Sequence, residues 1–487
     1  MAKTTLPPLD TLDPATEWAS WEPTPASPWD ARWAAHLYRR FGFGHTREEL
    51  KAAVDTGLAA TVDRMFADPK EPAPRPEIIS GAPPINPATN MPDASYQAAA
   101  LRAAWVQRML GGVQPAREKL ALFWHNHFAT SVRKVADGAL MERQGELLFR
   151  HALGSFPAML REISQDPAML VWLDSNQNVK GKPNENYARE VMELFTLGVG
   201  NYTEEDVRAA ARAFTGWHTS QGKFVLDAAQ HDTGEKSIFG QKGNWDGGDI
   251  LRFLLERPVC AQFLVRKMYR EFVSENQAPP DAFLKPLADA FRKSDYDIRV
   301  PAMMIARSRH FYSAHAYRQK IKSPIEYVLG TSRLIGVGVT GKVIISPYSL
   351  LGALELMGQS LYAPPNVKGW EGGAAWLSTA TVLARHNFSN ALVNGGGDLN
   401  EYAKKYNPRG FYPVANPLAL ALRSGQAGPE AIVKFFANVL LPDDCRDEVK
   451  QKLVTHIGKT DPSTEGYLQK CRDAVFVMLT LPEYQLN

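Results

Sequence analysis

The chain has 487 residues, a formal net charge of +3 and three cysteines. Its length allows one large helical domain or two to three smaller ones. The nearly balanced charge gives no strong field that would attract a polyanion, so we expect no nucleic-acid partner. The cysteines have no C-x-x-C spacing, which argues against a disulfide framework or a thiolate zinc site and fits a reducing compartment. No apolar run of 18 residues predicts a membrane span.

The first 29 residues are rich in proline and tryptophan and contain no apolar segment after a basic start. No secretory signal is therefore visible, which points to the cytoplasm if the N-terminus is native rather than trimmed. We expect residues 1–29 to form an extended, proline-rich arm. Trp18, Trp21 and Trp29 could pin this arm to the body of the protein.

Helical periodicity dominates the remaining chain, so we expect an all-α fold, a large multi-helical domain with a small β-hairpin insertion. The best strand candidates are Lys223–Asp227 and Ser237–Phe239. The predicted parts are a main domain at 30–398, with a proline-rich loop at 69–93 and the hairpin at 222–240, and a C-terminal helical segment at 399–487 packed on the main domain.

Several helix starts are marked by capping residues. A helix is expected from Asp30, and Thr46 with Glu49 has the spacing of a capping box. The Ser323-Pro-Ile-Glu326 sequence combines a capping box with proline at the first helical position and predicts another firm start.

Two histidines lie within the aromatic sequence Phe123-Trp-His-Asn-His-Phe128. On a continuous helix His125 and His127 would point about 200° apart and could not share a metal, whereas in an extended segment they would face the same way. Two interpretations stay open. The rings are either neutral, hydrogen-bonded core groups, or at least one is a metal ligand or an acid/base group.

The stretch from Asn184 to Trp217 is the densest in interpretable signals. Asn184 can cap a helix that Gly198 ends. At 100° per residue, one face of this helix is apolar and the other is polar. The apolar face holds Tyr187, Ala188, Val191, Met192, Leu194 and Phe195, and the polar face holds Glu185, Asn186, Arg189, Glu190 and Glu193.

Charge spacing on this helix singles out one carboxylate. Arg189 can pair with Glu185 or with Glu193, each four residues away, whereas Glu190 has no such partner. A second helix is expected from Thr203, with Asp206 completing a capping box. A charged face opposite an apolar stripe is often simply solvated, and a buried acid or metal site is the alternative.

Three polar loops supply further candidates. Asp174 and Asn176 precede the central helix and are placed to join its polar face. His231-Asp232 puts an imidazole beside a carboxylate, which suits metal binding or proton transfer but equally an ordinary turn. The glycine- and proline-rich loop at 364–373 could line a pocket through Lys368 and Trp370.

These segments together resemble the bacterial family known as domain of unknown function 1800. The resemblance runs colinearly over about residues 30–487. The segments that carry it are His36–Gly44 (HLYRRFGFG), Trp124–Phe128 (WHNHF), Asn184–Trp217, His231–Lys236, Lys322–Glu326, Pro364–Trp370 and Pro482–Gln485. It implies a mostly helical protein and no established activity. It also implies exported relatives and a partner from a sulfatase-like family that is often encoded nearby, so the location stays open.

Our leading hypothesis is a hydrolase acting on a glycosidic, ester or phosphoester bond. Two carboxylates in a partly buried pocket can divide acid and base roles, because burial raises one pKa while an arginine lowers another. The expected catalytic residues are Glu190, Glu193, Arg189, His231 and Asp232. No cofactor motif is present, but His125, His127 and Glu190 could hold a divalent metal. Further pocket candidates are Asn186, Trp217, His218, Lys236, Lys368 and Trp370.

The alternative is a non-catalytic binding or assembly protein in which the same polar cluster is a structural network. A cofactor-dependent oxidoreductase has no phosphate or haem motif to support it.

Overall fold

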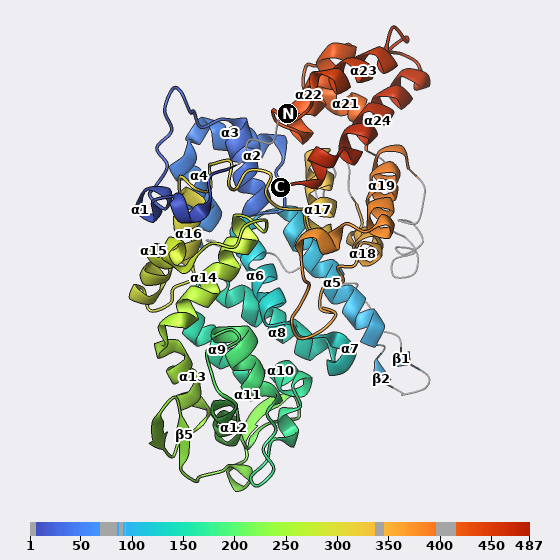
Figure 1. Ribbon diagram of the computed structural model, residues 1–487. Helices are drawn as coiled ribbons and strands as arrows, with labels where there is room; N and C mark the ends of the chain where they lie inside the picture. Colours follow the sequence, from blue (N-terminus) through green and yellow to red (C-terminus); the bar gives the residue numbers. More distant parts are fainter. Residues whose placement is uncertain (1–5, 69–84, 87–90, 93, 337–344, 396–414) are drawn as a thin grey trace. The chain divides into compact units, whose positions relative to one another are not determined.

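The computed structural model describes residues 6–68, 85–86, 91–92, 94–336, 345–395 and 415–487 (Figure 1). These residues form many helices and three two-stranded antiparallel sheets, which confirms the all-α fold with a small β part. None of the described helices is both long and apolar enough to cross a membrane. Most of the predicted proline-rich loop at 69–93 lies outside the described residues.

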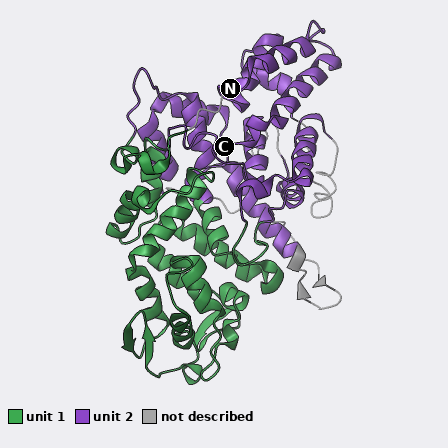
Figure 2. Ribbon diagram, viewed as in Figure 1, with its two compact units in different colours: residues 1–20, 120–310, 361–370 green, residues 21–119, 311–360, 371–487 purple. Residues whose placement is uncertain are grey.

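The chain divides into two compact units, each built from separate stretches of sequence (Figure 2). Unit 1 comprises residues 1–20, 120–310 and 361–370, and unit 2 comprises residues 21–119, 311–360 and 371–487. The short stretch 361–370 therefore belongs to unit 1 although its neighbours in sequence belong to unit 2. The division predicted at residues 29 and 398 stays a prediction.

Unit 1 contains the central helices and two of the sheets. Its helices are η1 (Leu9–Thr11), α1 (Pro14–Glu17), most of α6 (Pro115–His127), α7 (Val132–Val135), α8 (Gly138–His151), α9 (Phe156–Ser164), α10 (Pro167–Trp172), η2 (Ser175–Gln177), α11 (Asn186–Glu190), η3 (Val191–Thr196), α12 (Glu204–Ala213), η4 (Ala228–Gln230), α13 (Gly247–Glu256), α14 (Pro258–Phe272), α15 (Asp281–Lys293) and α16 (Arg299–Arg307). Its strands are β3 (Trp217–Ser220), β4 (Lys223–Leu226), β5 (Lys236–Ile238) and β6 (Gln241–Gly243).

Unit 2 contains the remaining elements. They are α2 (Ala31–Arg40), α3 (Arg47–Thr56), α4 (Leu58–Phe66), β1 (Ile85–Asn86), β2 (Met91–Pro92), α5 (Ala94–Gly111), α17 (Pro324–Leu334), α18 (Pro347–Leu356), η5 (Gly373–Trp376), α19 (Thr379–Asn394), α21 (Pro417–Arg423), α22 (Pro429–Leu440), α23 (Asp447–Ile457), α24 (Glu465–Thr480) and η6 (Pro482–Gln485).

The predicted helix starts are confirmed. Asp30 accepts a hydrogen bond from the Trp33 amide at the start of α2. Reciprocal capping boxes open α3 at Thr46, α12 at Thr203 and α17 at Ser323. These starts were predictable because each cap is a contact between residues three apart.

The predicted strand pairing was wrong. Lys223–Leu226 pairs with Trp217–Ser220, and Lys236–Ile238 pairs with Gln241–Gly243, so the region holds two hairpins. The turn residues Gln221, Gly222, Phe239 and Gly240 all have positive φ. Two-residue turns with positive φ at both positions match the twist of a hairpin, and Gln-Gly and Phe-Gly are weak sequence signals for them.

The tryptophans of the N-terminal arm are anchored within the unit to which each belongs. The indole N–H of Trp18 donates to the Phe283 carbonyl at 2.7 Å in unit 1. In unit 2, the indole N–H of Trp29 donates to the Ala53 carbonyl at 2.9 Å. The expectation that tryptophans pin the arm is therefore confirmed for these two side chains.

A buried ion pair joins α6 to α17 within unit 2. The Lys119 ammonium bonds the Glu326 carboxylate, and both side chains are at most 4% exposed. Burial alone would raise the pKa of Glu326, but Lys119 and Lys320 outweigh it and hold that pKa well below its ordinary value. Glu326 also accepts the Ser323 amide of the capping box. One carboxylate thus serves both the helix start and the contact between helices.

Replacing Lys119 with methionine should destabilise the protein strongly, because the buried Glu326 carboxylate would lose the ammonium group that bonds it. We expect Lys119→Met to cost about 3–5 kcal/mol in urea unfolding at pH 7. Lys51→Met is the matched control, since it removes an exposed ion pair with Asp55 and should cost about 0.5 kcal/mol or less. Equal losses in the two variants would contradict this account.

Candidate functional site

The central polar helix begins at Asn186 and changes pitch after Glu190. The Asn184 side chain accepts the Asn186 amide at 2.9 Å, so the predicted cap acts two residues before the first helical residue. From Val191 to Thr196 the chain forms a π-helix, η3. Gly198, with φ of +80°, ends it as predicted. A π-helix inserts one residue into the turn and is frequent at functional sites.

The change of pitch leaves the predicted faces largely intact. Of the six predicted apolar residues, five are buried and Leu194 is half-buried. The buried residues are Tyr187, Ala188, Val191, Met192 and Phe195. The polar face stays partly open to solvent, with Glu190 and Glu193 half-buried.

Arg189 uses its guanidinium to connect α11 with α12. It bonds Glu185 at 3.0 Å and both carboxylate oxygens of Glu204 at 2.7 and 2.9 Å. These carboxylates raise the pKa of Arg189, with Glu204 the largest contributor. The predicted pair with Glu185 is confirmed, whereas Glu193 is bonded elsewhere. The Arg189 side chain is therefore held in place by two carboxylates.

The two carboxylates Glu190 and Glu193 differ in their partners. Glu193 accepts a hydrogen bond from the Tyr202 hydroxyl at 2.6 Å. Within the described part of the chain, Glu190 has no hydrogen-bond or ion-pair partner. Burial raises the pKa of Glu190, and the neighbouring Glu193 raises it further, while Lys368 and Arg189 act in the opposite direction. Burial and Glu193 therefore both favour the protonated form of Glu190.

The polar face continues beyond Glu190 towards α10. Asn186 donates to the Asp174 carboxylate at 3.3 Å, and Lys134 pairs with the same carboxylate at 2.9 Å. Asp174 thus joins the polar face as expected. Asn176 does not, because its side chain accepts the Thr219 amide at the edge of β3.

The last turn of α6 holds the segment that carries Lys368. The His125 Nε2 atom accepts the Tyr362 amide at 3.0 Å. The Asn126 side chain accepts the Trp370 amide at 2.7 Å and donates to the Trp370 carbonyl at 3.3 Å. Two consecutive residues therefore fix both ends of the segment 362–370, between which the exposed Lys368 lies.

His127, one residue further, holds the π-helix instead. Its ring donates from Nε2 to the Phe195 carbonyl at 3.0 Å. Burial lowers the pKa of His125 to about 3 and the pKa of His127 well below its ordinary value. Burial thus favours the neutral form of both rings, and the backbone contacts through Nε2 agree with the first of the two interpretations.

The predicted metal set is not assembled. His125 and His127 lie on the continuous helix α6, in the geometry that prevents two residues two apart from sharing a metal. The Nε2 lone pair of His125 is already used by the Tyr362 amide. No group of three or more His, Cys, Asp and Glu side chains suited to a metal ion occurs among the described residues.

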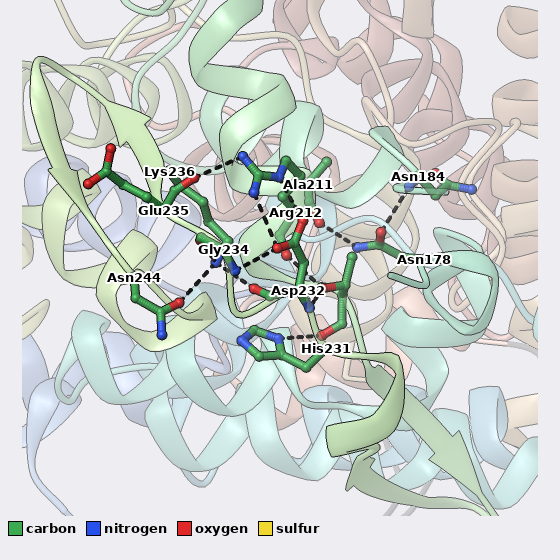
Figure 3. A network of polar contacts seen from close by, with 11 residues as sticks. Asn178, Asn184, Ala211, Arg212, His231, Asp232, Gly234, Glu235, Lys236 and Asn244 are labelled. Carbon is green, nitrogen blue, oxygen red and sulfur yellow. Dashed lines mark hydrogen bonds and ion pairs between the residues drawn. The ribbon is translucent and has the colours of Figure 1, made fainter. Parts of the chain in front are cut away.

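His231 and Asp232 belong to a separate network centred on Arg212 (Figure 3). Arg212 bonds both oxygens of Asp232, at 2.7 and 3.2 Å, and this contact lowers the pKa of Asp232 to about 2. His231 Nδ1 donates to the Thr215 carbonyl at 2.9 Å. No contact with Glu190 is found for either residue in the described chain. The pair holds the loop between the two hairpins in place.

The remaining pocket candidates also have structural contacts in this region. The buried Lys236 donates to the Asp232 and Gly234 carbonyls at 2.6 and 3.0 Å. Trp217 is buried against the Phe214 ring. His218 bonds the Asn178 carbonyl at 3.3 Å.

The structure therefore divides the predicted residues into two groups. Glu190 lies within electrostatic reach of Glu193 and Lys368, whereas no contact joins these groups to the His231–Lys236 network among the described residues. Three contributors escaped the sequence analysis, namely Asn126, Tyr202 and Arg212. Asn126 lies inside the WHNHF sequence, in which only the two flanking histidines were considered as site residues. Tyr202 and Arg212 carry no local signal, because their partners depend on the turn after Gly198 and on the hairpins.

Glu190→Gln should make the protein more stable at neutral pH. The folded-state pKa of Glu190 is raised, so its ionised form costs stability once the pH exceeds the unfolded-state pKa, and the cost grows until the pH passes the folded-state pKa. Glutamine stays neutral throughout. Melting temperatures from pH 3 to 8 should therefore show an advantage for the variant at pH 7 that disappears in acid.

The control for this comparison is Glu205→Gln on the neighbouring helix α12, where the exposed carboxylate pairs with Arg208. It should give no gain in stability at pH 7. A loss of stability in Glu190→Gln at pH 7 would show instead that Glu190 is held by favourable contacts.

Gly369→Ala tests the attachment of the 362–370 segment. Gly369 has φ of +81°, and a Cβ atom there would lie 2.1 Å from Asn126 Oδ1 and 2.5 Å from the Asn126 carbonyl oxygen. Gly181→Ala is the control, since Gly181 has φ of +83° with no atom within 4 Å. We expect about 1 kcal/mol of destabilisation from backbone strain at Gly181 and at least ~2 kcal/mol at Gly369. Similar losses of stability in the two variants would mean that Asn126 can move away from the added Cβ atom at little cost.

Comparisons with known proteins agree with the sequence resemblance. A family described as protein of unknown function (DUF1800) has a model that matches residues 36–486. The comparison with curated proteins found no match, and neither did the comparison with solved structures.

Proposed function

The chain belongs to the DUF1800 family, and we propose, from the geometry and electrostatics of its polar face, that it is an acid/base hydrolase in which Glu190 is the proton donor. The observation that carries the proposal is the state of Glu190. It is a half-buried carboxyl group with a raised pKa and, within the described residues, no hydrogen-bond partner. A raised carboxyl pKa is what a general acid needs near neutral pH.

The three groups of the polar face would have distinct roles. Glu190 protonates the leaving oxygen, and Glu193, oriented by Tyr202, takes a proton from the attacking water. Lys368, which lowers the pKa of Glu190, stabilises the carboxylate that forms when the proton leaves. Together these steps consume one water and cleave one bond, and Glu190 and Glu193 must then exchange a proton through solvent before the next turnover.

Of the three bond types considered, a glycosidic bond fits this set best. Its hydrolysis requires one protonated carboxyl group and one carboxylate that flank the bond. Ester and phosphoester cleavage more often rely on a nucleophile with an oxyanion hole or on metal ions. The proposal uses no metal ion, and it assigns His125 and His127 the role of holding backbone groups through Nε2.

The alternative is a non-catalytic binding or assembly protein. The Arg212–Asp232 network and the histidines of α6 support a structural role for those groups, because Arg212 bonds Asp232 and each histidine bonds a backbone group through Nε2. Glu190 does not fit that pattern. A partner from the sulfatase-like family stays a prediction of the resemblance.

A panel of nitrophenyl glycosides, esters and phosphoesters tests the proposal. Wild-type protein should release nitrophenol from at least one glycoside, and Glu190→Gln and Glu193→Gln should each lower kcat by about 10²-fold or more. Glu205→Gln should keep the wild-type rate. Activity that survives in Glu190→Gln, or activity lost through unfolding of that variant, would contradict the assigned role.

A further inference from the structure

Arg39 is a buried guanidinium for which the described residues supply no hydrogen-bond partner at Nε or Nη2. It lies in the last turn of α2, within the His36–Gly44 sequence, and is 7% exposed. Its Nε and Nη2 atoms are buried and make no hydrogen bond. No ion pair to Arg39 occurs in the described part of unit 2. The nearest aromatic contact is the Tyr317 ring, 5.9 Å from the guanidinium carbon.

The neighbouring arginines Arg40 and Arg318 each donate to an oxygen acceptor, whereas no such bond from Arg39 is found among the described residues. Arg40 donates to the Ala316 carbonyl at 2.5 Å. Arg318 bonds the Asp444 carboxylate at 2.8 Å through Nε. The same carboxylate also accepts a hydrogen bond from the Tyr317 hydroxyl. Asp444 therefore already accepts hydrogen bonds from two donors.

Two more cations on the other side of the cluster are also engaged. Lys322 donates to the Tyr484 carbonyl at 2.6 Å, and Arg385 donates to the Lys322 carbonyl at 2.7 Å. Backbone carbonyls satisfy the donors of these groups but do not neutralise their charge. Arg40 also donates to an oxygen of Asn487 at 3.3 Å. Glu326 acts on Lys322, and Asp444 acts on Arg39, as countercharges. These two side-chain carboxylates are fewer than the arginine and lysine side chains of the cluster.

The titration of nearby groups reflects this excess. Burial lowers the pKa of Arg39 to about 9, and Arg318 is the next contributor. The pKa of Lys322 is lowered well below its ordinary value by burial and then by Arg318 and Arg39. His36 shows the same direction, with burial first and Arg40 and Arg39 next. Asp444 is the carboxylate that acts against the excess at Arg39.

The two unbonded atoms of Arg39 have a specific geometry. Nε–H and Nη2–H point the same way along one edge of the guanidinium plane, which is the edge that binds a carboxylate or a phosphate with two parallel hydrogen bonds. A buried charge without a partner costs several kcal/mol, so an unused bidentate edge calls for an anion.

We propose that Arg39, with Arg40, Arg318 and Lys322 around it, forms a binding site for a small oxyanion bearing a phosphate or a carboxylate group. The site lies in unit 2 and is independent of the function proposed for Glu190. The anion completes the charge balance of the cluster and stabilises the fold of unit 2 around the His36–Gly44 sequence.

Thermal unfolding in matched buffers tests this site. In chloride buffer of fixed ionic strength, about 10 mM inorganic phosphate should raise the Tm of the wild-type protein by about 2 °C or more, because a ligand that binds only the folded state stabilises it. Acetate and citrate at the same ionic strength form the second arm. A rise with phosphate alone assigns a phosphate site, and a rise with the carboxylates assigns a carboxylate site.

Arg39→Met should abolish the rise in Tm, whereas Arg208→Met, which removes an exposed arginine of α12, should keep it. In chloride alone, Arg39→Met should be at least as stable as wild type, because it removes an uncompensated charge. The proposal is overturned if no oxyanion raises the Tm of the wild type, or if the rise persists in Arg39→Met. It is equally overturned if Arg39→Met unfolds in chloride, since the chain itself would then satisfy Arg39.

Discussion

The last turn of α6 is the constraint on which the candidate site depends. Its residues His125, Asn126 and His127 are consecutive, and each bonds the backbone of a distant segment of unit 1. His125 and Asn126 hold the two ends of the segment that carries Lys368. His127 holds the carbonyl of Phe195 in the π-helix that follows Glu190. Because the bonds are made to backbone groups, they do not occupy the side chains of Lys368 and Glu190.

Polar side chains that hold the fold together are distinct from the polar side chain proposed to take part in catalysis. The Arg212–Asp232 pair and the Arg189–Glu204 pair join elements of unit 1 and leave few unused atoms on those side chains. Glu190 is the contrasting case, since burial and Glu193 raise its pKa while no described group bonds it. A carboxyl group placed in this way reduces stability unless it is protonated. Proteins keep such groups mainly where chemistry uses them.

The sequence predicted the fold class and the helix starts because both depend on local patterns. The capping boxes at Thr46, Thr203 and Ser323 each involve residues three apart, and they were confirmed. The hairpins were paired wrongly, since Gln221-Gly222 and Phe239-Gly240 are uncommon turn sequences.

The candidate site could be located from sequence but not resolved into roles. Glu190 stood out because it lacked a partner four residues away, and the structure adds that Glu193 bonds Tyr202 rather than Arg189. The π-helix from Val191 to Thr196 could not be foreseen by a count of 100° per residue. The backbone partners of His125 and His127 are Tyr362 and Phe195, which are 237 and 68 residues away in sequence. Contacts at such separations cannot be predicted from local sequence, so a metal-ligand role was considered for the histidines.

The most direct test of this account is the pKa of Glu190 itself, measured by ¹³C NMR on protein with labelled glutamate side chains and assigned with Glu190→Gln. We predict a value above that of a solvated glutamate in the wild type. It should rise further in Lys368→Met, and also in Asn126→Ala, where the segment carrying Lys368 loses its anchor. An ordinary value that neither substitution changes would contradict the claim that the end of α6 positions Lys368 to act on a Glu190 whose pKa is raised.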